Sequence, residues 1–455
     1  MVNHEIETIK IAALTIHAHH LQILYCADEF QFSTQVFYHD VSFPALASNY
    51  SQSVIDCIAA HIALFEGMKL CSLFPKNYDV STIAEHLSPA SIDLFYQVYA
   101  GVFAQHWYEN QVTDYAGPEM IFPGKELGES HPTEILGDRQ TILTGCGGGK
   151  DSIVAMKILQ EADIPFASMQ YAHSIYGKAE AQHDLIADVL DCATPIRKHK
   201  ISIYDNFVEH PFLELYFPQI ANITIPETPV SVFESLFLAL QWEYHDLNLS
   251  HEKSANTGNF FWPEINREVN HQWGKSFAAE TLLNQFIQNN LLANFTYFSL
   301  LQPIYDVRIF KNLARYPEVL NKIHSCNIQK PWCKKCPKCA YVWLGLMSVF
   351  PPKLVDSIFE KNLFDDPDLL LTFKQMLGLA QHTPFECIGE VDESRLNMYK
   401  CWEKGLSGKA LDLFQETFLQ DSSIDWFAIE QKYDRVYETD HNIPDFVLTR
   451  IKPYL

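Results

Sequence analysis

The sequence LTGCGGGKDS, residues 143–152, decides our prediction of the fold. It follows a short apolar run at residues 141–144 and precedes a run with helical periodicity at residues 152–161. A glycine-rich turn between a strand and a helix is typical of the tip of a parallel strand, where open α/β sheets bind their ligands. The stretch therefore predicts an anion-binding turn in an α/β protein.

The strand and helix patterns continue to alternate beyond this turn. The later runs lie at residues 165–172, 178–189, 201–204, 230–242 and 247–249. Alternation of this kind indicates a parallel sheet with helices on its faces. We assign the sheet to a central domain at residues 136–350.

Different patterns flank this central part. Three alternating apolar runs near the start predict short antiparallel strands, and two longer runs predict helices; they lie at residues 9–14, 21–25, 34–38, 53–73 and 91–108. A stretch rich in Pro, Gly and acidic residues, 113–138, is interpreted as a linker. Helical patterns return at residues 354–362, 366–377, 408–418 and 425–433. The predicted fold class is α/β, with a mixed α+β N-terminal domain at 1–135 and a helical C-terminal region at 351–455.

Each residue type in the turn has a plausible part in holding a triphosphate. Gly147, Gly148 and Gly149 lack side chains, so their backbone N–H groups can approach phosphate oxygens closely. Ser152 adds a hydroxyl at the start of a helix, whose dipole favours anions. Asp151 offers a carboxylate for Mg²⁺, and Lys150 offers a charge for the leaving phosphates. The simpler alternative is a turn that only links a strand to a helix.

The spacing matches neither a Walker P-loop nor a dinucleotide-binding turn. It resembles the Ser-Gly-Gly-x-Asp-Ser signature of PP-loop ATP pyrophosphatases, with Gly147 in place of the first Ser. The resemblance implies a PP-loop (HUP-like) sheet and an enzyme that breaks ATP between its α and β phosphates. The substitution removes one hydroxyl from the predicted phosphate site.

Four further motifs sharpen the resemblance. They are EKSANTGN at 252–259, VNHQWGKS at 269–276, YFSLL at 297–301 and PFECIG at 384–389. Together with the glycine turn they are similar to the family of UDP-N-acetylmuramoyl-L-alanyl-L-glutamate epimerase, over residues 50 to 395. The resemblance implies that ATP and Mg²⁺ are used to convert the terminal L-Glu of a UDP-sugar dipeptide to D-Glu in peptidoglycan synthesis.

Adenylation explains why such an epimerase needs ATP. A free carboxylate resists loss of its α proton, whereas an acyl adenylate removes that charge and makes the proton acidic. One base and one acid must then stand on opposite faces of the α carbon. The candidates are His251, Glu252, His271 and Lys275, while Ser254 and Asn259 are expected to bind nucleotide. Taken singly, each histidine could equally be a structural loop residue.

Cysteines 326, 333, 336 and 339 form a second cluster with the spacing C-x6-C-x2-C-x2-C. Cys326, Cys333, Cys336 and Cys339 predict one tetrahedral Zn²⁺, structural because four protein ligands close its shell. A similar pattern holds structural zinc in the PP-loop synthase that makes the nitrile of deazaguanine. Free or redox-active thiols and ordinary packing remain the alternatives. The PFECIG segment is equally consistent with a substrate contact or a turn.

Charge and hydropathy limit the possible partners. With 33 Lys and Arg against 56 Asp and Glu, the formal charge of −23 disfavours a nucleic-acid substrate. No apolar run is long enough for a membrane-spanning helix, so we expect a cytoplasmic protein with no membrane partner. Two alternatives to the epimerase are a PP-loop enzyme that adenylates a nucleobase or tRNA, and a nucleotide-binding regulatory protein without catalysis.

Overall fold

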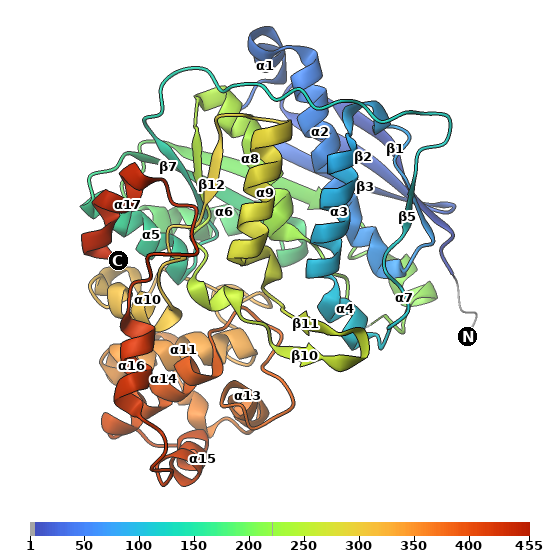
Figure 1. Ribbon diagram of the computed structural model, residues 1–455. Helices are drawn as coiled ribbons and strands as arrows, with labels where there is room; N and C mark the ends of the chain where they lie inside the picture. The colour runs from blue at the N-terminus through green and yellow to red at the C-terminus, as the bar shows by residue number, and fades with distance from the viewer. Residues whose placement is uncertain (1–4, 221) are drawn as a thin grey trace.

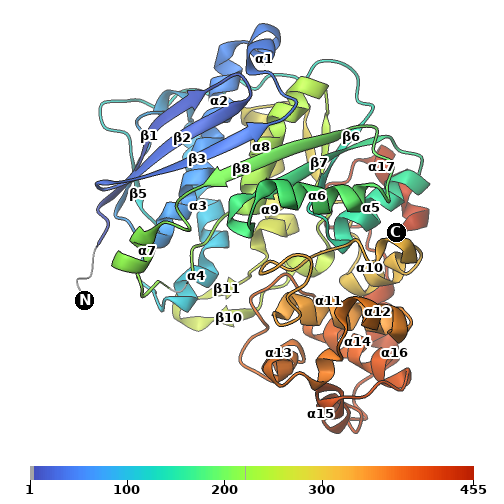
Figure 2. The same ribbon diagram turned by 180° about the vertical axis from the view of Figure 1, so that it is seen from behind.

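One ten-stranded sheet runs through the computed structural model, which describes residues 5–220 and 222–455 (Figures 1 and 2). Its strand order is β12-β9-β6-β7-β8-β3-β2-β1-β4-β5. In chain order these strands are β1 Thr8–Ile16, β2 His20–Ala27, β3 Phe30–Tyr38, β4 Asn77–Asp79, β5 Glu119–Ile121, β6 Ile142–Cys146, β7 Phe166–His173, β8 Lys198–Asp205, β9 Asp246–Asn248 and β12 Thr296–Phe298. A separate hairpin joins β10 Phe260–Trp262 to β11 Arg267–Val269.

The central strands β12, β9, β6, β7 and β8 pair with one another in parallel. The predicted parallel sheet is therefore confirmed, and its predicted strands coincide with β6, β7, β8 and β9. Seven of the eight residues of β7 are buried, as expected for a strand with helices on both faces. β12 was not predicted. The PP-loop identity of this sheet stays a prediction.

The N-terminal strands β1, β2 and β3 form the predicted antiparallel set. β3 also pairs antiparallel with β8, so the sheet continues from residues of the predicted N-terminal domain into the central one. β4 and β5 extend the far edge in parallel. Because β5 lies inside residues 113–138, the segment interpreted as a linker contributes a strand. The division into three domains stays a prediction.

The helices of the first 300 residues cover the sheet unevenly. They are α1 Phe43–Tyr50, α2 Gln52–Glu66, α3 Pro89–Val102, α4 Ala104–Glu109, α5 Lys150–Glu161, α6 Ala179–Leu190, α7 Pro211–Tyr216, α8 Glu227–Trp242 and α9 Phe277–Asn290. α2, α3, α8 and α9 lie on one face (Figure 1), whereas α5 and α6 cover the other face beside the central strands (Figure 2). Among the described residues, no helix covers the opposite face of β1–β3 (Figure 2), which fits their alternating burial.

The C-terminal part is helical, as predicted. Its helices are α10 Asp306–Leu313, α11 Pro337–Val349, α12 Pro352–Phe359, α13 Leu370–Met376, α14 Val391–Glu403, α15 Lys409–Phe418, α16 Trp426–Asp434 and α17 Asp445–Ile451. Their apolar faces share one hydrophobic core with α5. Four of these helices were not predicted: α10, α11, α14 and α17. In the described residues, no helix combines the length and hydropathy needed to cross a membrane.

Candidate active site

A cavity of about 460 Å³ lies at the carboxyl end of the central strands. The glycine turn that follows β6 forms one side of it, and Ser250, His251 and Glu252, which follow β9, form another. Residues 271–275, the segment from His324 to Lys330, and Cys387 complete the lining. Chain segments far apart in sequence thus meet where an open parallel sheet usually binds ligands.

The three glycines of the turn have different surroundings. A side chain at Gly147 would meet no atom within 4 Å, so its backbone is open to the cavity. Gly148 has φ of 82°, and a side chain there would come within 2.1 Å of the His324 ring. The backbone N–H of His324 donates a hydrogen bond to the Gly148 carbonyl oxygen at 2.9 Å, which holds the turn against this segment. The turn thus presents open main chain to the cavity at Gly147, and the binding of phosphate by its three glycines stays a prediction.

Helix α5 begins directly after the turn. Its N-cap, Gly149, has no side chain to satisfy the first amides, and the Ser152 hydroxyl donates to the Gly149 carbonyl at 3.1 Å. The free amides of a helix start favour a bound anion. Gly149, Asp151 and Ser152 all line the cavity.

Lys150 does not line the cavity. Its ammonium lies beneath the turn, where it forms ion pairs with Asp151, at 2.6 Å, and with Asp306. Burial opposes the charge, but these two carboxylates raise the pKa of Lys150. The lysine therefore offsets the negative charges of Asp151 and Asp306. Asp306, the first residue of α10, was missed because nothing local marks it as a partner of a residue 156 positions away.

Glu252 is buried and lines the cavity. Burial, followed by repulsion from Asp151 and Asp306, raises the pKa of Glu252 to about 7. Such a carboxylic acid keeps its proton at neutral pH far more often than an exposed one. Its neighbour His251 is also buried, and burial, followed by the Lys275 charge, lowers the pKa of His251 well below its usual value.

Lys275 contacts a cysteine outside the predicted set of catalytic residues. Its ammonium lies 2.8 Å from the Cys387 sulfur, and the Lys338 ammonium donates to the Cys387 carbonyl. His271 stands beside the same cysteine, and its Nδ1 lies 2.6 Å from the Gln105 side-chain oxygen. The PFECIG segment had been interpreted as a substrate contact or a turn, and the structure brings its cysteine to the cavity.

Ser254 and Asn259, predicted to bind nucleotide, are absent from the lining of this cavity. The Ser254 hydroxyl donates to Glu393 at 2.7 Å, and the Asn259 side chain links Thr383 and Pro384 to the His271 backbone. Both side chains hold cavity-forming segments together. They line a second, smaller cavity of about 310 Å³ beside α14.

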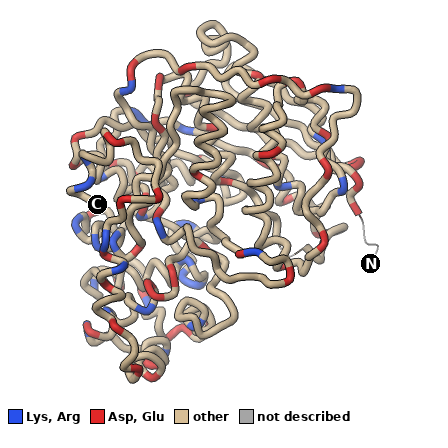
Figure 3. The backbone as a smooth tube through the Cα atoms, in the orientation of Figure 1, with Lys and Arg blue, Asp and Glu red and all other residues tan. Residues whose placement is uncertain are grey.

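Two further cations line the cavity. Lys330 and Lys338 line the cavity with His324, Ser325 and Asn327. Acidic residues are otherwise spread along the whole chain (Figure 3). A cationic wall in so acidic a protein favours an anionic ligand at this place. Neither lysine was among the predicted site residues.

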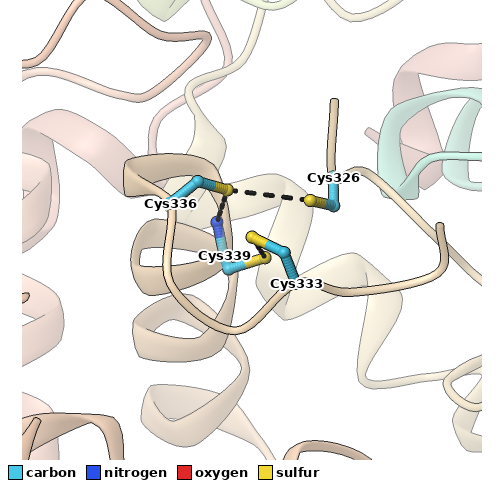
Figure 4. Close-up of side chains that lie close together, drawn as sticks. All are labelled: Cys326, Cys333, Cys336 and Cys339. Carbon is cyan, nitrogen blue, oxygen red and sulfur yellow. Dashed lines mark hydrogen bonds between the residues drawn. The ribbon is translucent and has the colours of Figure 1, made fainter. Parts of the chain in front are cut away.

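The four clustered cysteines meet in space (Figure 4). The Cys326 and Cys336 sulfurs are 3.8 Å apart, as are those of Cys333 and Cys339, and all four lie within 4.8 Å of one another. A tetrahedral Zn²⁺ with Zn–S bonds of about 2.3 Å requires S–S edges of about 3.8 Å. The cluster therefore fits a metal ion such as zinc. It also lies next in sequence to Ser325 and Lys338 of the cavity wall.

Comparisons with known proteins agree along most of the chain. A family model described as the MurL N-terminal domain matches residues 3–300, and one described as the MurL C-terminal domain matches residues 321–410. Three curated relatives carry the name UDP-N-acetyl-alpha-D-muramoyl-L-alanyl-L-glutamate epimerase.

The three relatives come from different bacteria. The protein from Salinispora tropica is 27% identical over 321 residues, which cover 68% of this chain and 65% of that protein. The protein from a Micromonospora species is 29% identical, with 68% and 67% covered, and the protein from Xanthomonas oryzae pv. oryzae is 30% identical, with 58% and 57% covered. The chain thus spans slightly less than two thirds of the length of the first relative.

Proposed function

The chain belongs to the MurL family, and from this premise we propose that it epimerises the terminal L-Glu of UDP-MurNAc-L-Ala-L-Glu to D-Glu in peptidoglycan precursor synthesis. The name that all three relatives share supports this substrate and this reaction. The proposed reaction consumes ATP, releases AMP and pyrophosphate, and proceeds through an acyl adenylate.

One observation carries the proposal: the open main chain of the glycine turn borders the same cavity as a set of proton-transferring side chains. Gly147 and Gly149 offer backbone amides to phosphate oxygens, while Glu252 and Lys275 stand on the other walls. A cavity that binds ATP alone would not need the second group. A cavity of about 460 Å³ also falls in the range usual for small-molecule sites.

Three groups support ATP binding by a PP-loop mechanism. The uncapped start of α5 and Ser152 would bind phosphate oxygens, and Asp151 would hold Mg²⁺ by its carboxylate. Mg²⁺ would offset charge on the phosphates during displacement of pyrophosphate. Lys150 would act indirectly, because its ion pairs with Asp151 and Asp306 keep the acidic groups under the turn oriented.

The carboxylate of the substrate would attack the α phosphorus of ATP, so that a C–O–P bond forms and the bond to pyrophosphate breaks. The resulting acyl adenylate carries no carboxylate charge, and its α proton is therefore easier to remove. A base on one face removes that proton, an acid on the other face returns one, and water then releases AMP. His251, Glu252, His271 and Lys275 remain the proposed candidates, since all four line the cavity.

We also propose that the four-cysteine cluster holds structural zinc. The sulfur spacing supports four thiolate ligands, which would leave no position on the metal for substrate. Bound zinc would tie the start of α11 to the segment around Cys326, and these two elements supply Lys338, Ser325 and Lys330 to the cavity. Its effect on catalysis would therefore be indirect.

One assay tests the proposed function. The protein is incubated with ATP, Mg²⁺ and UDP-MurNAc-L-Ala-L-Glu in D₂O, and the nucleotide products and the stereochemistry of glutamate are measured. We expect equal amounts of AMP and pyrophosphate, and a D-Glu product with deuterium at its α carbon. Unchanged L-Glu with no AMP would refute the proposal, and an untouched dipeptide with adenylation of a nucleobase would favour the alternative enzyme.

A further inference from the structure

Cys387 lines the cavity and is in contact with two lysine ammonium groups. Its sulfur accepts a hydrogen bond from the Lys275 ammonium at 2.8 Å, and the Lys338 ammonium binds its backbone carbonyl. One side-chain atom each of His271, Glu386 and Cys387 lies within 4.8 Å of the other two. The cysteine lines the cavity, so its sulfur is positioned to meet a bound substrate.

The surroundings of the sulfur favour its anionic form. Burial opposes a negative charge, but the ammonium groups of Lys275 and Lys338, together with His271, hold the pKa of Cys387 well below its usual range. A thiolate is the reactive form of cysteine in proton abstraction and in nucleophilic attack.

The surroundings of Glu252 favour its protonated, neutral form. Burial raises the pKa of Glu252 to about 7, so its carboxyl holds a proton at a pH at which an exposed carboxyl has lost its own, whereas the pKa of the Cys387 thiol is lowered. Lys275 lies near both groups, since its charge acts on Cys387 and on Glu252 alike. Two titratable groups whose pKa values are driven apart in one site are the usual signature of an acid and base pair.

We propose that Cys387 is a catalytic residue, whose thiolate removes the α proton of the activated L-glutamyl group, and that Glu252 returns a proton on the opposite face. The inference rests on the proposed function. The Cα–H bond breaks, its proton goes to sulfur, and its electron pair enters the enolate. A new Cα–H bond then forms with the Glu252 proton, which leaves a thiol and a carboxylate that are reset by exchange with water.

The order of these roles follows from the charges before reaction. The Lys275 ammonium bound to the sulfur favours the thiolate, and burial favours the protonated form of Glu252, so sulfur is assigned as the base for the L isomer. Lys275 is not available as that base, because its ammonium is bound to the thiolate and keeps its protons. The Nδ1 of His251 is directed to the hydroxyls of Tyr297 and Ser299, at 3.4 and 3.3 Å.

The first test uses Cys387→Ser, which preserves shape but replaces the thiolate with a poor base. With the dipeptide substrate in D₂O, we expect AMP formation to remain near the wild-type rate, while epimerisation falls by about 10²- to 10⁴-fold. Cys192→Ser, at the end of α6 and outside the cavity, is the matched control and should leave both rates unchanged. Epimerisation at the wild-type rate in Cys387→Ser would overturn the proposal.

Glu252→Gln gives a second test that does not depend on the first variant. Without its acid, the enzyme should still form the enolate through Cys387, so deuterium should enter recovered L-Glu without formation of D-Glu. AMP formation with neither exchange nor inversion in this variant would overturn the assignment of Cys387 as the base. A wild-type enzyme that forms no AMP at all would instead refute the proposed function.

Discussion

A methyl group added at Gly148 should lower the stability of the fold, whereas one added at the neighbouring Gly147 should weaken ATP binding. At Gly148, with φ of 82°, alanine must adopt a backbone that costs about 1–2 kcal/mol for an L residue. Its methyl group would also lie 2.1 Å from the His324 ring, so the ring must move, at a further cost of about 1 kcal/mol for overpacking. Gly148→Ala should therefore lower the free energy of unfolding by about 2–3 kcal/mol.

Gly147→Ala is the matched control, because its methyl group would meet no atom within 4 Å. We expect it to change the free energy of unfolding by less than about 0.5 kcal/mol, as is usual for substitutions without a steric conflict. Its methyl group would point into the cavity, however, and should hold a triphosphate away from the backbone. Gly147→Ala should therefore weaken ATP binding while leaving stability unchanged.

Urea denaturation followed by tryptophan fluorescence measures the first quantity, and isothermal titration calorimetry with ATP measures the second. Equal stability losses in the two variants would refute the geometry of the turn. ATP affinity unchanged in Gly147→Ala would instead show that the nucleotide does not approach this part of the backbone.

Three further predictions test other parts of the site. Asp151→Asn should reduce AMP formation by at least about 100-fold, because the proposed metal loses its carboxylate ligand. The melting temperature should change little, since Lys150 keeps its ion pair with Asp306. Near-normal turnover would remove Asp151 from the metal site. Cys336→Ser should lower the amount of bound zinc, measured by mass spectrometry. It should also lower the free energy of unfolding by roughly 4 kcal/mol. Unchanged stability would argue against a structural metal. Burial raises the pKa of Glu280 from 4.5 to about 7. Its protonated form thus stabilises the fold below pH 4.5, and this contribution of about 3 kcal/mol is lost as pH rises to 7. Denaturant titrations of Glu280→Gln should lack that loss, and an identical pH profile in both proteins would contradict it.

The regular parts of the fold were predictable because their signals are local. β6, the strand before the glycine turn, begins with an apolar pair and is almost wholly buried, and helix α5 follows the turn with an apolar run of helical length. β12 spans only Thr296–Phe298, which is too short to show a period, and it becomes a strand because β9 offers it a partner. β5 likewise forms within a polar segment by pairing with β4.

The site was predictable only where its residues follow the strands directly. Asp151 and Glu252 come just after β6 and β9, so their location at one edge of the sheet follows from the topology. The partner of Lys150, Asp306, and the partner of Lys275, Cys387, lie more than 100 residues away. Such pairs arise from the packing of α10 and of the PFECIG segment, and sequence spacing holds no information about them.

The antiparallel pairing of β3 with β8 makes the first 135 residues and the remainder of the chain mutually dependent. If the polypeptide were severed between β5 and β6, each piece would expose one long strand whose backbone N–H and C=O groups face water. Expressed separately, the pieces should be prone to self-association through those strands. Produced together they should recombine along them, which makes this junction a natural place to build a fragment-complementation reporter.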